Sequence, residues 1–397
     1  MSPIKNQKQL KRNNVKKIIL AIKQAKTTSK TQLSKGLGLS FATVSNICNN
    51  LMEKGLVWIE ESETSTGGRK PADIGLNKNS RYILTLNLSN NLYFEVALLN
   101  LHFETIFKTR KTFSKLHQFE SLIEEIKNLY TEILKKTGIN ESVILGLGVA
   151  IPGTVSLKTG LVVESSNPLL TYNDLHTKLE TSLKLPTFIS NDANISAIMA
   201  ATFFDKNFQN LLYIYFSKGI GLGIIIDGSI FTGAEGYAGE LGHWKVTDSD
   251  IPCECGQTGC FRMVTLERIL RVYYNFEGSN DEFSEKEESL LDDFVKKYKK
   301  GNKEVHNILS SHGRVIGDVI GTLTDIFNPE VVVLGGTLSP LLQLMIGDIR
   351  AAAGERSFNS DRAGLQIETD QDSEETVLKG CAEGVFQQWL DGKMVRS

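Results

Sequence analysis

One histidine and three cysteines in the second half of the sequence have the types and spacing of a metal site. His243 is followed by Cys253, Cys255 and Cys260. Three thiolates and one imidazole form a closed tetrahedral set for zinc, which leaves no position for an activated water. We therefore predict a structural zinc ion. Five cysteines in a chain of 397 residues make a poor disulfide framework, so disulfide bonds are not expected. The alternative to a metal site is a group of free buried thiols.

Other polar residues have the chemistry to bind a ligand close to this cluster. Glu240 precedes His243 by three residues, and a carboxylate beside a metal-fixed imidazole suits the recognition of hydroxyl groups. Asn191 and Asp192 follow a predicted strand and open a helix. They form either an ordinary helix cap or, in a sugar-kinase fold, the site of the base that takes a proton from a hydroxyl.

The elements that must position these residues alternate between strands and helices. Helical patterns occur at 119–136, from 195 onward and at 312–327, and apolar runs predict strands at 82–87, 92–99, 143–151, 187–190, 211–216, 223–226 and 331–334. This alternation indicates an α/β fold, in which glycine-containing turns at strand ends hold ligands. The highly charged stretch 277–304 is predicted to form an exposed loop and helix.

The first 80 residues differ in charge from the rest of the chain. They contain 14 lysines and arginines against 5 acidic residues, whereas the remainder contains 30 against 41. A basic head on an acidic body indicates a polyanionic partner, the alternative being a solvated basic surface. No apolar run reaches the ~18 residues of a membrane span, and no signal-peptide core is present, so we expect a cytoplasmic protein without membrane contact.

The basic head has the pattern of a helix-turn-helix. A helix is predicted at 13–25, a second after the capping box of Ser29 and Gln32, and a third at 41–54 after Ser40. Phe41 is expected to share an apolar stripe of the third helix with Val44, Ile47 and Leu51. The polar residues that this helix would present to DNA are Thr43, Ser45, Asn46, Asn49 and Asn50. The alternative is a small, solvated helical bundle.

A wing follows the third helix in the sequence. Strands are predicted at 56–60 and 72–76, with a glycine-rich turn that contains Arg69 and Lys70 between them. Arginine and lysine on such a turn can enter a narrow minor groove, where the negative potential is strongest. We therefore predict DNA contacts by Arg69 and Lys70, against the alternative of a flexible basic hairpin.

Several motifs together resemble the ROK family, named for repressors, open reading frames and sugar kinases. They lie at 219–223, 227–228, 239–243 and 253–260, and the winged head resembles the repressor branch of the family. The resemblance implies an α/β fold with a winged helix-turn-helix, 1–78, followed by a two-lobed, actin-like, sugar-kinase-like domain. The lobes would span 79–190 and 191–397, the second with the zinc knuckle and a C-terminal helix that packs back on the first.

The resemblance also implies roles for individual residues. His243, Cys253, Cys255 and Cys260 match the zinc ligands of the family. The residues that match its sugar site are Gly153, Asn191, Asp192, Glu240 and His243.

Two positions depart from the family pattern. Family kinases hold ATP phosphate and metal on an Asp-x-Gly-Gly-Thr-like turn, but residues 87–91 read Asn-Leu-Ser-Asn-Asn, without the carboxylate or the glycines. We therefore predict that the chain is not a kinase and that Asp192 is a vestigial base. Arg262 stands where many members have a glutamate that contacts sugar. It either binds an anionic or phosphorylated sugar, or faces solvent or an internal acid.

These observations predict a sugar-responsive DNA-binding regulator. It would repress carbohydrate-utilisation genes as a homodimer or homotetramer on double-stranded operator DNA, until a sugar or sugar phosphate releases it. Activation would use the same parts. The alternatives are a bifunctional sugar kinase with a DNA-binding head, and a DNA-binding protein whose body serves only for oligomerisation.

Overall fold

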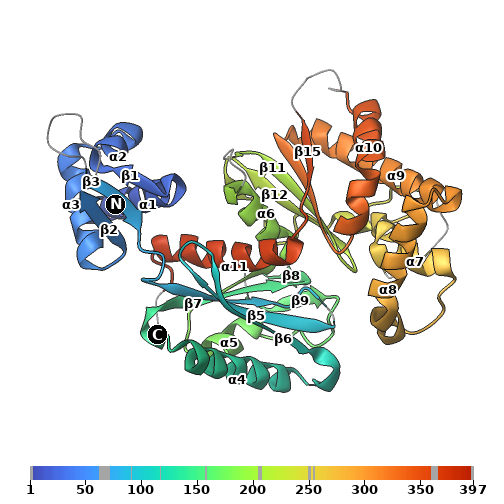
Figure 1. Cartoon of the computed structure of the whole chain (residues 1–397), viewed down its shortest axis with the longest axis horizontal. Coiled ribbons are helices and arrows are strands. Elements are labelled where there is room, and N and C mark those ends of the chain that lie inside the picture. Colours follow the sequence, from blue (N-terminus) through green and yellow to red (C-terminus); the bar gives the residue numbers. More distant parts are fainter. Residues whose placement is uncertain are drawn as a thin grey trace.

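The computed structural model divides into a small head and two larger α/β lobes (Figure 1). It describes residues 3–61, 72–90, 92–116, 118–156, 159–203, 208–248, 252–253, 255–358 and 365–394. Arg69 and Lys70 lie outside the described residues, as do Asn91 and Glu254. Among the helices that are described, none combines the length and apolarity required to cross a membrane.

The head packs three helices on a small antiparallel sheet with the strand order β1-β3-β2. Its elements are α1 (Pro3–Ala25), β1 (Thr27–Ser29), α2 (Lys30–Leu37), α3 (Phe41–Glu53), β2 (Val57–Glu61) and β3 (Ala72–Leu76). The capping box of Ser29 and Gln32 forms as predicted, and Ser40 caps α3. The two strands predicted for the wing form and pair with each other, and a third strand that the sequence did not suggest, β1, pairs with β3.

The first lobe is built on a mixed sheet with the strand order β10-β7-β4-β5-β6. The strands are β4 (Tyr82–Asn87), β5 (Tyr93–Asn100), β6 (Thr105–Thr112), β7 (Ile144–Ile151) and β10 (Thr187–Asn191). The helices α4 (Phe119–Thr137) and α5 (Leu175–Leu183) cover one face (Figure 1). Short helical turns η1 (Phe113–Lys115) and η2 (Glu141–Val143) and a hairpin of β8 (Gly153–Val155) and β9 (Val162–Ser165) complete the lobe.

The second lobe repeats this sheet arrangement with the strand order β13-β12-β11-β14-β15. Its strands are β11 (Leu211–Phe216), β12 (Ile220–Ile226), β13 (Ser229–Ile230), β14 (Val331–Gly336) and β15 (Gln366–Thr369). Its helical segments are α6 (Asp192–Phe203), η3 (Leu241–His243), η4 (Phe261–Val264), α7 (Leu266–Tyr274), α8 (Asn280–Lys299), α9 (Lys303–Phe327) and α10 (Ser339–Arg356). In both sheets, the first strand along the chain pairs antiparallel with the second and parallel with the fourth.

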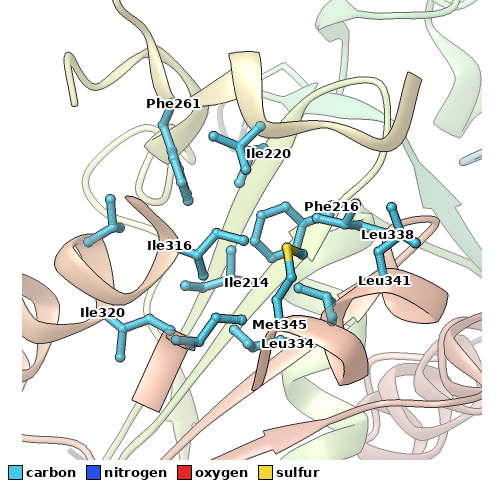
Figure 2. Close-up of a cluster of buried hydrophobic side chains, with 14 of the residues drawn as sticks. Ile214, Phe216, Ile220, Phe261, Ile316, Ile320, Leu334, Leu338, Leu341 and Met345 are labelled. Carbon is cyan, nitrogen blue, oxygen red and sulfur yellow. The ribbon is translucent and has the colours of Figure 1, made fainter. Parts of the chain in front are cut away.

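The main core of the second lobe lies between its sheet and the helices α9 and α10. Figure 2 shows Ile214 and Phe216 of β11 and Leu334 of β14 facing Ile316 and Ile320 of α9. On the other face, α6 packs against β11 and β12. Gly223 of β12 makes this approach possible, because a side chain there would collide with the backbone of Ala193 in α6.

The helical pattern from Ile195 onward extends back to Asp192, so that Asn191 and Asp192 open the helix as predicted. Two expectations about local structure were wrong. The stretch 277–304, expected to be exposed, contributes Phe283 and Phe294 of α8 to the core of the second lobe. Phe41 does not share the buried stripe of α3, because its side chain is 55% exposed, whereas Val44 is fully buried. Phe41 is the first residue of the helix and lies beyond the end of the head's core.

The final helix, α11 (Ser373–Leu390), lies against the first sheet and reaches both the second lobe and the head (Figure 1). It contacts β4 and β7 of the first lobe, α6 of the second and α1 of the head. Lys23 of α1 and Glu383 of α11 form a buried ion pair with an Nζ–Oε2 distance of 2.7 Å. The Lys23 ammonium also lies 3.5 Å from the ring centre of Phe103. The head is therefore attached to the body through its first helix.

Candidate functional site

A cavity of about 180 Å³ lies between the two lobes, and polar side chains from both line it. The first lobe contributes the β8–β9 hairpin and the end of β10, and the second contributes the start of α6, β12 and the segment that leads into η3. The residues predicted to bind sugar all line this one cavity: Gly153, Asn191, Asp192, Glu240 and His243.

Hydrogen bonds hold the polar groups of this cavity in place. The Asn191 side-chain amide donates to the Gly153 carbonyl at 3.0 Å, and its oxygen accepts from the Ala193 N–H at 2.9 Å. Asn191 thus joins the β8 backbone to the first turn of α6. The Thr154 hydroxyl donates to the Glu240 carboxylate at 2.8 Å, which links the two lobes across the cavity. Sequence reasoning missed Thr154, because nothing local distinguishes it from other strand threonines.

Asp192 lies at the floor of the cavity and is 5% exposed. Its burial raises the pKa of the carboxyl to about 7, the negative charge of Glu240 adds to the rise, and the Ala193 N–H, which donates to Asp192 at 2.9 Å, opposes it. A carboxyl group with such a pKa can accept a hydrogen bond from a ligand hydroxyl when ionised and donate one when protonated.

The histidine and the three cysteines come together beside this cavity, and His243 also lines it. The ligand atoms of His243, Cys253, Cys255 and Cys260 lie within 4.8 Å of one another. Cys253 Sγ is 3.7 Å from His243 Nδ1, and Cys255 Sγ is 3.7 Å from Cys260 Sγ. The edge of a tetrahedron with zinc–sulfur bonds of about 2.3 Å is about 3.8 Å long. These two separations match that edge, so the four residues could hold a metal ion of this size.

Arg262 also lines the cavity, from the helical turn η4 that follows the last cysteine. Its guanidinium donates to the Lys218 carbonyl at 3.4 Å. Arg262, which stands where the resemblance predicts a glutamate, thus lines the same cavity as Glu240 and His243. Tyr215 and Glu164, which the sequence did not single out, also line the cavity.

A second, smaller cavity of about 50 Å³ lies beside the turn that departs from the kinase pattern. Within that turn, the Asn87 side-chain oxygen accepts from the Ser89 N–H at 3.0 Å. The cavity is also lined by Glu267 and Glu287, and burial, with the charge of Glu267, raises the pKa of Glu287. The Ser89 N–H is therefore already hydrogen-bonded to the Asn87 side chain, and the carboxyl groups of Glu267 and Glu287 lie beside this turn.

The helix α3 of the head presents most of the residues predicted to contact DNA. Asn46, Asn49 and Asn50 are exposed, and Thr43 and Ser45 are half-buried. Lys30 of α2 donates to Ser45 Oγ at 3.2 Å and to Asn49 Oδ1 at 2.8 Å. Sequence reasoning missed Lys30, which fixes two of these side chains from a neighbouring helix.

Comparisons with known proteins identify the class of both parts. Residues 91–382 match the model of the ROK family, and residues 12–57 match a winged helix-turn-helix DNA-binding model. The chain belongs to the ROK family and carries a winged helix-turn-helix at its N-terminal end.

Individual proteins resemble the chain over most of its length. A xylose repressor from Caldicellulosiruptor bescii is 29% identical over 388 residues, which cover 96% of this chain and 97% of the relative. The crystal structure of a ROK family transcriptional regulator, a homologue of the E. coli MLC protein, superposes with a TM-score of 0.77 at 21% identity. It covers 96% of this chain and 100% of that one.

ROK kinases have the same body fold. A ROK family glucokinase from Streptomyces griseus, in complex with glucose and AMPPNP, superposes with a TM-score of 0.64 at 19% identity. The match covers 77% of this chain and 99% of the glucokinase. The expected winged helix-turn-helix followed by a two-lobed ROK body is thereby confirmed.

Proposed function

We propose that this chain is a sugar-responsive transcriptional repressor whose head, residues 1–78, binds operator DNA and whose body binds the sugar that releases it. The observation that carries the proposal is the combination, in one chain, of a winged helix-turn-helix and an interlobe cavity lined by Asn191, Asp192 and Glu240. Fixed carboxylates and an amide suit sugar hydroxyls, because each can accept or donate hydrogen bonds at a defined position.

The coupling between the two sites runs through α6 and α11 in this proposal. Asp192 begins α6, α6 packs on α11, and α11 contacts α1 of the head. A sugar that binds one arrangement of the lobes better than the other shifts the population of head arrangements, and a homodimer or homotetramer then no longer fits half-sites spaced by multiples of about 10 bp.

The body binds sugar without phosphorylating it in this proposal. The Ser89 N–H is already bonded to Asn87, and the acidic residues Glu267 and Glu287 lie beside the turn where a kinase would place phosphates. A bifunctional kinase remains the competing function, since kinases share the fold and Asp192 is retained.

The metal at the cysteine cluster is zinc in this proposal, bound by His243, Cys253, Cys255 and Cys260. It would order the loop between these residues and orient the His243 ring, with no catalytic role. Gly259 supports the tight path of the loop, because its φ is +73° and a side chain there would collide with the Thr247 backbone.

The effector is a monosaccharide in this proposal, and Arg262 decides between a neutral and an anionic form. A guanidinium on the cavity wall pairs well with a phosphate or carboxylate of the ligand. Xylose and its 5-phosphate, and glucose and its 6-phosphate, form matched pairs that test this choice. Tighter binding of the neutral member in both pairs would show that Arg262 does not serve an anion.

Operator titration with the full chain tests the whole proposal. The DNA upstream of the chain's own gene, at a stated salt concentration, is titrated with and without each sugar. We expect tight DNA binding that at least one sugar weakens about 10-fold or more. Steady ADP release with the same sugars would favour the kinase, and DNA binding unaffected by any sugar would favour a body that serves only for oligomerisation.

A further inference from the structure

Phe41 is an exposed aromatic residue at the start of α3, the helix whose polar residues are predicted to contact DNA. It is the first residue of α3, after the cap Ser40, and 55% of its surface is exposed. Val44, Ile47 and Leu51 form the buried face of α3, and Phe41 is not a member of the apolar core of the head. The ring is therefore available to a partner of the head.

The side chains around Phe41 show which way it faces. Residues four apart on a helix form a row, so Phe41 lies in line with Ser45 and Asn49. Ser45 and Asn49 are the two residues that Lys30 holds from α2. This row therefore begins with the apolar ring of Phe41 at the N-terminal end of the helix. It continues with Ser45 and Asn49, whose side chains are held by Lys30.

The neighbouring row of the same helix supports a close approach of DNA to this end. It consists of Ala42, Asn46 and Asn50, all exposed. A methyl group at position 42, beside the Phe41 ring, leaves space where a longer side chain would keep DNA away. The N-terminal residues of a recognition helix are those that reach base edges. The first 80 residues, with 14 basic and 5 acidic side chains, attract the duplex.

We propose that Phe41 reads a thymine by packing its ring on the 5-methyl group in the major groove. This inference rests on the proposed DNA-binding function. The thymine methyl is the apolar feature of base edges in that groove, and a phenylalanine can contact it there. Phe41 is in this sense a specificity-determining residue, and the asparagines and Ser45 form hydrogen bonds with flanking base edges or phosphates.

Replacing thymine by uracil tests the contact, because uracil lacks the methyl group and keeps the same hydrogen-bonding edge. The probe is a duplex enriched by the full chain from a randomised DNA library. Each thymine of the enriched half-site is replaced by uracil in turn, and the Kd is measured at fixed salt. We expect one or two thymines per half-site at which the wild-type chain binds about 4-fold more weakly, the equivalent of about 0.8 kcal/mol for one buried methyl group.

The Phe41→Ala variant should bind the thymine duplex about 4-fold more weakly or worse, and should no longer distinguish thymine from uracil at those positions. Phe41→Leu should retain part of the discrimination. The matched control is Met52→Ala, which removes a 45% exposed apolar side chain from the last turns of the same helix. It should discriminate as the wild type does. Unchanged thermal unfolding of Phe41→Ala would show that the head still folds.

The outcomes separate this inference from the function on which it rests. If no sequence is enriched, the proposed DNA-binding function is wrong and the inference is lost with it. If a sequence is enriched but uracil has no effect at any thymine, or the same effect in Phe41→Ala, the head binds DNA and the inference alone is wrong. Phe41 is then a solvent-exposed residue without a role in sequence discrimination.

Discussion

The two cavities between the lobes meet at Ser217, which lines both, but they differ in what they can bind. The larger one, of about 180 Å³, is lined by Asn191, Asp192 and Glu240, held by hydrogen bonds to neighbouring groups. The smaller one, of about 50 Å³, lies beside the turn that follows β4 and is lined by Glu267 and Glu287. In a kinase, both sides would be needed for phosphoryl transfer.

The difference between the two cavities indicates that the turn after β4 can change its residues while the sheet that carries it keeps its arrangement. The hairpin of β4 and β5 in the first lobe corresponds in position to that of β11 and β12 in the second. The strands of both are buried and held by core packing, and among the described residues of the turn after β4, Leu88 also joins that core whereas Asn90 does not. Residues that hold a phosphate can therefore change without loss of the fold, while the sugar side keeps its polar groups.

The largest effect on sugar binding in the larger cavity is expected from loss of the cysteine and histidine cluster. Replacing Cys260 by serine should remove one metal ion per chain, disorder the loop that carries His243 and weaken sugar binding about 100-fold or more. Metal content and calorimetric sugar titration measure the two effects. Cys48→Ala, outside the cluster, should keep the metal. Full sugar affinity in a metal-free Cys260→Ser chain would contradict a structural role of the metal.

A smaller effect is expected from the titration of Asp192, whose pKa burial raises to about 7. If the ionised carboxyl accepts a bond from a sugar hydroxyl, sugar affinity should increase about 10-fold as the pH rises from 6 to 8. Asp192→Asn should bind more weakly, with a flat pH profile. A pH dependence that survives this substitution would assign the titration to another group.

The same pKa has the opposite consequence for folding. Because the folded chain holds the Asp192 proton up to about pH 7 and the unfolded chain releases it near its ordinary pKa of 3.8, this group makes the sugar-free protein less stable as the pH rises between these values. The free energy of unfolding of Asp192→Asn should fall less steeply over this interval. Identical slopes for both proteins would contradict the burial of an ionisable carboxyl there.

The smallest effect on sugar affinity is expected from a substitution in the smaller cavity. A glutamate is replaced by glutamine in each cavity, so that the two variants can be compared. Glu287→Gln should change sugar affinity by less than about 2-fold, whereas Glu240→Gln on the sugar side should weaken it about 10-fold or more, the usual cost of losing a charged hydrogen bond. Calorimetry with one sugar measures both variants. Equal losses would mean that the two cavities act as one site.

The sequence predicted most of the elements, because their signals are local. The capping box of Ser29, the cap Ser40 and the apolar runs of β7 and β11 each depend on a few neighbouring residues. The strand β1 was missed because it consists of three polar residues that pair with β3, more than 40 positions away. The placement of Phe41 depends on where the core of the head ends, which helical periodicity cannot give.

The candidate site could be anticipated only where a motif names its members. The spacing of the cysteines and the family motif predict Glu240 and His243 as site residues, and both line one cavity in the structure. Thr154 and Lys30 carry no such signal, since each matters through a partner on another element, Glu240 and Asn49 respectively. The ion pair of Lys23 and Glu383 joins opposite ends of the chain and leaves no trace in either neighbourhood.

That ion pair joins two helices that also share an apolar core. Ile18 and Ile22 of the first helix share an apolar cluster with Leu378 and Phe386 of the last one. During synthesis, the head emerges from the ribosome before α11, which supplies part of its packing surface. A growing polypeptide can therefore fold the head early, yet it can pack the head against the body only once α11 has emerged.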